Sequence, residues 1–152
     1  SNENDSYVTY NYREGPWATG SIARTCGADR DVFAYPLWVS ADGYIYEHEV
    51  GFNYDSATLF AESGPVELGD GDNTLYLNGL IPDDKTLGDV QVRFGTKFYP
   101  TGTEYSYGPY SLANPTSFRL TGRQIAARIE GVRLADWRVG TIRLDGKQGG
   151  RR

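Results

Sequence analysis

The single histidine of the chain, His48, stands between two glutamates and is the first residue that could take part in acid–base chemistry. Such catalysis needs a proton donor and a proton acceptor within hydrogen-bond distance of the proton that moves. Neighbouring side chains of a strand point to opposite faces, so Glu47 and Glu49 would lie on the face opposite His48. A second strand would have to supply the carboxylate. The pattern therefore favours a structural histidine over a catalytic one.

Other signatures of catalysis are missing from the sequence. Cys26 is the only cysteine and has no neighbouring base, and there is neither a Gly-x-Ser-x-Gly nucleophile elbow nor a phosphate-binding P-loop. A glycosidase would need two carboxylates roughly 5–10 Å apart, and nothing in the sequence brings Glu47 or Glu49 near Asp70 or Asp72. We predict that the protein is not an enzyme and binds no cofactor. A lone cysteine also excludes an internal disulfide and fits assembly in a reducing compartment.

The acidic, glycine-rich stretch from Gly69 to Asn73 resembles a calcium-binding loop. Its two aspartates and its asparagine offer the hard oxygen ligands that Ca²⁺ takes. It lacks the twelve-residue spacing and the closing glutamate of an EF-hand, and the same residues are common in ordinary turns between strands. No metal ligand is predicted here, and the choice between a calcium loop and a turn stays open.

Arginines recur in the last third of the chain. Residues 117–152 carry nine basic and three acidic side chains, whereas residues 1–60 carry three basic and nine acidic ones, and residues 61–116 three and eight. With a net charge of −5, the chain as a whole is not a basic nucleic-acid binder. The arginines form either a solvated face paired with acidic neighbours or an interaction surface. The candidates for a subunit interface are Arg119, Arg123, Arg128, Arg138 and Arg143.

Aromatic side chains offer an alternative kind of site. Trp137, Tyr107 and Tyr110 could stack on sugar rings, as in carbohydrate-binding sandwiches. The same residue types fill the cores of sandwiches and the centres of protein interfaces. Glycan binding for attachment to a host surface is therefore the alternative function.

Strands have to position these residues, because the composition indicates an all-β protein. The 152 residues include 19 glycines, 7 prolines and 12 tyrosines, which is typical of many short strands joined by turns. No window of the sequence combines a helical period with caps. No apolar run reaches the length of a membrane span.

Two hairpins are predicted within residues 1–55. Tyr7 to Tyr12 turns back into Trp17 to Arg24, a pattern typical of the outer hairpin of a propeller blade. A second pair of strands, Phe33 to Val39 and Tyr44 to Val50, flanks a turn at Ala41-Asp42-Gly43. Four strands offer no second layer, so we expect these propeller-blade-like hairpins to pack on a larger body.

Residues 56–152 are predicted to form a separate domain of six to eight strands, each with one apolar face. The clearest strand runs from Asp89 to Tyr99, with Val90, Val92 and Phe94 among its inward residues. One-faced strands of this number favour an antiparallel β-sandwich of jelly-roll type.

Two further strands of this domain carry more specific expectations. Thr74 to Ile81 is predicted as a strand with Leu75, Leu77 and Ile81 on one face. A strand from Trp137 to Leu144 is predicted to change face at Gly140, where a glycine can host a bulge.

Residues 124–130 alternate like a strand with one buried face. Ile125 and Ile129 belong to the apolar side, and Arg128 and Glu130 to the other. We expect that second side to be polar.

Short motifs spaced along most of residues 7–152 carry a resemblance to a known family. In the second half they are Glu62 to Pro65, Gly69 to Asn73, Gly79 to Asp83, Tyr107 to Tyr110, Gly122 to Gln124 and Asp136 to Gly140. In the first half they are Tyr10 to Tyr12, Trp17 and Ala41 to Gly51. With its Gly-Gly-Arg-Arg end, the chain resembles the C-terminal portion of tailed-bacteriophage virion proteins, of the podovirus tail nozzle, tail tube or DNA-stabilisation kind. Family members are several-fold longer and this chain has no methionine, so we interpret it as a processed product or a fragment.

The resemblance implies a structural, non-enzymatic role in the virion, for a protein assembled in the cytoplasm of a host bacterium. Subunits of this kind pack as a ring around the DNA channel, retain the genome and release it during DNA ejection. The partners implied are other copies of the chain and neighbouring tail proteins, with non-specific proximity to DNA. We further hypothesise that the acidic first two thirds meet the basic last third of a neighbouring subunit.

Overall fold

The computed structural model describes residues 5–52, 58–67, 73–133 and 135–151. Within these residues every regular element is a β-strand and every strand pairing is antiparallel, which confirms the all-β prediction. Contacts divide the chain into two compact units, Ser1–Gly51 and Phe52–Arg152. The predicted domain boundary between residues 55 and 56 lies outside the described residues. In the part of the chain that the structure describes, no helix is long and apolar enough to cross a bilayer.

The first unit opens with a hairpin of β1 (Tyr7–Tyr10) and β2 (Trp17–Gly20), as the sequence predicted. Asn11 builds the turn, because its side-chain oxygen accepts hydrogen bonds from the backbone N–H groups of Arg13 (3.1 Å) and Glu14 (3.3 Å). Gly15 closes the turn with a φ of 84°, a left-handed conformation that glycine adopts without strain.

The rest of the first unit is a three-stranded meander of β3 (Cys26–Ala28), β4 (Leu37–Val39) and β5 (Ile45–Glu47), in that spatial order. The β4–β5 hairpin was predicted, and Asp42 caps its turn by accepting a hydrogen bond from the Tyr44 N–H at 3.1 Å. No pattern in the sequence indicated β3. Its central residue is Gly27, and a Cβ there would come within 2.5 Å of the Trp38 ring. The strand depends on a packing contact, so its own residues do not reveal it.

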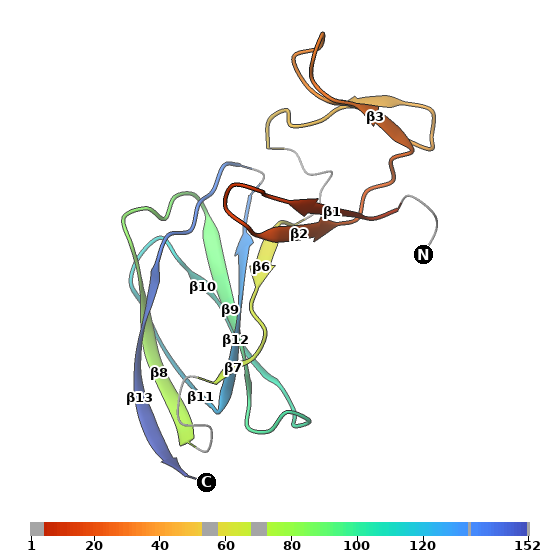
Figure 1. Ribbon diagram of the computed structural model, residues 1–152. Coiled ribbons are helices and arrows are strands. Elements are labelled where there is room, and N and C mark those ends of the chain that lie inside the picture. The colour runs from red at the N-terminus through yellow and green to blue at the C-terminus, as the bar shows by residue number, and fades with distance from the viewer. Residues whose placement is uncertain (1–4, 53–57, 68–72, 134, 152) are drawn as a thin grey trace. The chain divides into compact units, whose positions relative to one another are not determined.

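The second unit contains eight strands in its described residues, arranged in two sheets (Figure 1). They are β6 (Phe60–Glu62), β7 (Val66–Glu67), β8 (Asn73–Pro82), β9 (Val90–Lys97), β10 (Tyr105–Ser111), β11 (Thr116–Gly122), β12 (Gln124–Gly131) and β13 (Ile142–Arg151). One sheet has the order β10-β9-β12-β6, with β7 also on β12, and the other has the order β11-β8-β13. The arrangement is sandwich-like. Its jelly-roll type and the propeller-like nature of the first unit stay predictions.

An apolar layer joins the two sheets of the second unit. The alternation of β9 places Val90, Val92 and Phe94 in this layer, as predicted. From the other sheet, Phe118 on β11 packs against Phe94, with 5.2 Å between ring centroids. Tyr110 on β10 stacks on Phe118 at 4.7 Å. Burying a side chain of this size contributes roughly 1.5–3 kcal/mol to folding, so this layer holds the sandwich together.

The predicted face of β8 was wrong at its end. Leu80 is 1% exposed, whereas Ile81 is 41% exposed. The reason is a change of register against β13, where Gly146 pairs with Leu77 but Asp145 pairs with Gly79. One extra residue on β8 at this point shifts the side chains after it to the opposite faces. The prediction assumed that side chains alternate strictly along the whole of β8, and this assumption was wrong after the register shift.

The predicted strand from Trp137 to Leu144 was wrong over residues 137–141, and only its last three residues lie in a strand. The strand β13 begins at Ile142 and continues to Arg151, through a polar segment that no hydrophobic pattern marks. Before it, Asp83 holds the chain in place by accepting a hydrogen bond from the Thr141 N–H at 2.8 Å. Gly140 lies against the Asp83 side chain, so it provides space for this contact and does not form a bulge within a strand.

We predict that Leu80→Ala lowers the free energy of unfolding by about 2–5 kcal/mol, because it opens a cavity in the apolar layer. The neighbouring Ile81→Ala should cost below about 1 kcal/mol, because Ile81 points outward. Urea denaturation followed by circular dichroism measures both. Equal losses for the two variants would contradict the register shift in β8.

Candidate functional site

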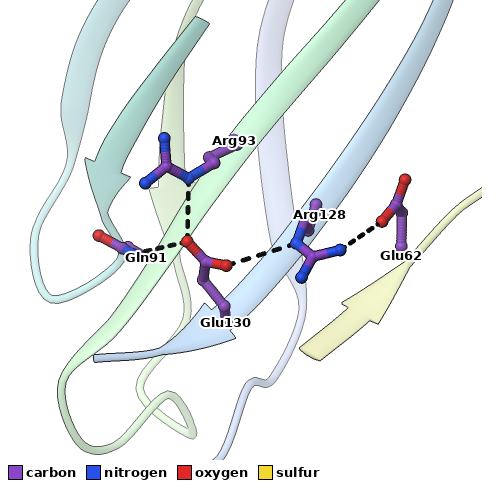
Figure 2. A network of polar contacts seen from close by, with 5 residues as sticks. All are labelled: Glu62, Gln91, Arg93, Arg128 and Glu130. Carbon is purple, nitrogen blue, oxygen red and sulfur yellow. Dashed lines mark hydrogen bonds and ion pairs between the residues drawn. The ribbon is translucent and has the colours of Figure 1, made fainter. Parts of the chain in front are cut away.

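Glu130 is a buried carboxylate on the outer face of the larger sheet. It is 8% exposed and lies on the side of β12 that the sequence predicted to be polar. Its Oε1 accepts hydrogen bonds from Gln91 Nε2 (2.7 Å) and Arg93 Nε (2.9 Å), and its Oε2 accepts one from Arg128 Nε (3.3 Å). Arg128 also donates to Glu62 Oε2 at 2.8 Å (Figure 2). The long side chains of its neighbours, rather than the apolar layer, cover Glu130.

The register of three strands creates this network. Arg128 on β12 pairs directly with Arg93 on β9, so two positive charges face each other across the ladder. Like charges in such a pair repel. Glu130 stands two residues along β12 and bonds to both arginines, while Glu62 on β6 pairs with Arg128 from the other side. Two carboxylates thus neutralise two guanidinium groups on one face.

Electrostatics make this network a structural element. The hydrogen bond from Arg93 is the main cause that lowers the pKa of Glu130, with Arg128 and Gln91 adding to it and burial opposing it. The Glu62 contact is the main cause that raises the pKa of Arg128. A general acid or base works best when its pKa lies near neutral pH. Both groups move away from that range, so the arrangement locks the sheet and is poorly suited to proton transfer.

The structure divides the five candidate interface arginines among different places. Arg128 belongs to the network and also covers the Phe60 ring, with its Cζ 3.6 Å from the ring centroid. Arg123 lies between β11 and β12, and its Cζ is 5.3 Å from the Tyr99 ring centroid.

The other three arginines are exposed. Arg119 on β11 stands between the buried Phe118 and Leu120, so it points outward. Arg143 on β13 pairs with the outward Ile81. Arg138 lies before β13, in an isolated bridge with Leu87. Only Arg119 and Arg143 share a face, the outer face of the three-stranded sheet.

The three aromatic residues of the alternative site pack against the apolar layer instead of forming a stacking platform. Tyr107 and Tyr110 lie on β10 and are partly buried against the core. Trp137 is partly buried too, and its ring covers Gly131. It borders a hollow of about 320 Å³ lined by Gly88, Asp89, Arg133, Ala135, Asp136 and Trp137. The structure does not bring the three rings together on an exposed surface.

The remaining candidates of the sequence do not converge on a site. His48 accepts a hydrogen bond from Arg24 Nε at 2.9 Å, and its ring centroid lies 6.0 Å from that of Trp38, so both contacts are with residues of its own unit. Cys26 is exposed. Gly69 to Asp72 lie outside the described residues. Among the residues that are described, no group of three His, Cys, Asp or Glu side chains could hold a metal ion.

Sequence reasoning missed the burial of Glu130 and its partners. The signal that could have revealed it is the pairing of Arg128 with Arg93, because two facing arginines require a carboxylate nearby. That pairing follows from the register of β9 and β12, which the sequence alone does not give.

Comparison with known proteins adds no relative. No protein-family model, curated protein or solved structure matches this chain.

We predict that Glu130→Gln lowers the free energy of unfolding by about 1–3 kcal/mol, because it leaves Arg93 and Arg128 facing each other without the charge between them. The matched control is Glu104→Gln, which breaks the exposed ion pair to Lys97 (2.9 Å) on the same sheet. The control should lower the free energy of unfolding by less than about 1 kcal/mol. Urea denaturation of both variants measures these losses. Equal losses in the free energy of unfolding would contradict the claim that Glu130 stabilises the sheet more than an exposed ion pair does.

The network also predicts a pH dependence. The folded state lowers the pKa of Glu130 below its ordinary value of 4.5. The contribution of the ionised Glu130 to the free energy of unfolding is therefore fully present above pH 4.5. The contribution is lost as the pH falls through the folded pKa. The difference in the free energy of unfolding between the native chain and Glu130→Gln should therefore be constant from pH 7 to pH 5.5 and become smaller below pH 4.5. Denaturation curves at stepped pH test this, and a gap that widens in acid would contradict it.

Proposed function

We propose that the chain is a structural component of a bacteriophage tail, of the nozzle or tube type. It acts through contacts with other copies and with neighbouring tail proteins around the DNA channel, and it resides in the virion. The resemblance of its motifs to the ends of such virion proteins supports this role. The observation that carries the proposal is the composition of the surface of the first unit.

The first unit exposes large apolar side chains and has no core of its own in its described residues. Between residues 5 and 51 only Pro36 is buried. Trp17 is 69% exposed and Val32 is 89% exposed. Isolated hairpins are marginally stable in water, so a unit with this many exposed large apolar side chains favours contacts with other protein. A subunit that completes its fold within an assembly accounts for these features.

The finer fold assignments belong to the same proposal. The hairpins of the first unit would be blade-like elements of a propeller-like body, and the second unit a sandwich of jelly-roll type. The role would be non-enzymatic, consistent with the lowered pKa of Glu130 and with the structural contacts of His48. The alternative, glycan binding, has no such support, because Trp137, Tyr107 and Tyr110 pack against the apolar layer.

The proposal predicts that the chain is a fixed part of the virions made from the genome that encodes it. Quantitative mass spectrometry of gradient-purified particles should find it at a constant number of copies per particle, with the major capsid protein as internal reference. Particles assembled without the chain should fail to retain or to eject their DNA. A chain found only free in the lysate, with particles unaffected by its loss, would contradict the proposal.

A further inference from the structure

The outer face of the three-stranded sheet combines exposed cations with exposed apolar side chains. Arg143 pairs with Ile81 and Lys147 pairs with Tyr76, and Arg119 stands on the opposite edge strand, with β8 between. All five side chains are exposed. We call Tyr76, Ile81, Arg119, Arg143 and Lys147 the basic face. Asp145 is the only acidic residue in the sequence of β8, β11 and β13.

The two sheets of the sandwich differ in whether their cations form ion pairs. On the larger sheet Arg93, Lys97 and Arg128 are each neutralised by a carboxylate of the same unit, at 2.8–2.9 Å. No ion pair within the described residues involves Arg119, Arg143 or Lys147. Within the described residues, Asp145 on β13 is the acidic group next to these cations, so the basic face keeps an excess of positive charge that another molecule can complement.

The first unit offers a surface of the opposite sign. Its described residues carry seven acidic and three basic side chains. Its edge strand β5 brings acidic and apolar groups together, because Tyr44 and Ile45 are each 67% exposed and Glu47 and Glu49 are exposed too. We call Tyr44, Ile45, Glu47 and Glu49 the acidic edge.

We propose that the basic face receives the acidic edge of a second copy of this chain. The proposal rests on the proposed function and names its subunit contact. Charge complementarity is combined with apolar groups on both sides, as at protein interfaces. Two different surfaces then pair head to tail, which propagates into a ring or a filament.

Charge reversal in the full-length chain tests this contact. Arg119→Glu/Arg143→Glu reverses the basic face, and Glu47→Lys/Glu49→Lys reverses the acidic edge. Sedimentation should show that the native chain self-associates at low salt and dissociates as salt rises, because rim charges are screened. Each double variant alone should self-associate roughly tenfold more weakly or worse. A mixture of the two variants should assemble again, because each supplies the sign that the other lacks.

The matched control reverses two exposed cations outside the basic face, Lys85→Glu/Arg133→Glu, with the same change in net charge. It should leave association unchanged. Circular dichroism of every variant checks the fold, and a rescued mixture also shows that both variants are folded. Association that survives both reversals would overturn this contact and leave the proposed function standing, whereas a native chain that stays monomeric at every salt concentration would count against both.

The basic face could instead bind nucleic acid, and the same variants separate the two cases. A duplex DNA fragment that binds the native chain and Glu47→Lys/Glu49→Lys, but not Arg119→Glu/Arg143→Glu, would assign the basic face to phosphates if the native chain does not self-associate. That result would overturn the contact with a second copy.

Discussion

The apolar layer around Phe94 is the constraint on which the rest of the second unit depends. Phe94 is fully buried on β9 and packs against Phe118 from the other sheet. Because each sheet buries one face against this layer, its other face is free to carry charge. The larger sheet uses that face for the Glu130 network. In the described residues, no ion pair involves Arg119, Arg143 or Lys147 on the outer face of the three-stranded sheet, so the two outer faces differ in how their cations are balanced.

The first unit has no comparable layer in its described residues, and this changes how its sequence can be understood. Its turns are well determined, since Asn11 and Asp42 hold them through side-chain hydrogen bonds. Local turn chemistry can therefore shape the hairpins without a core. It does not supply the burial of roughly 1.5–3 kcal/mol per large apolar side chain that stabilises a domain. Trp17 and Val32 stay exposed in this unit, and our proposal is that contacts with other protein cover them.

Much of the fold was predictable from local signals, and the failures share one cause. The alternation of β9 and the turn residues of the hairpins lie within single segments, so the sequence displays them directly. The outward Ile81, the polar strand β13 and the buried Glu130 depend on the register of neighbouring strands. Register is set by pairing between residues far apart in the chain, and a bulge on β8 is enough to invert a face. None of the proposed sites could be placed without it.

Arg128 and Arg143 show why this limit matters for function. Both alternate with apolar residues on a strand, so their sequence contexts look alike. The partners of Arg128 are Glu62 and Glu130, whereas Arg143 pairs with Ile81. The first arginine stabilises its own sheet, whereas the second is exposed beside Ile81. An arginine-rich stretch thus contains two physically different sets of residues, and the pairing strand decides to which set each one belongs.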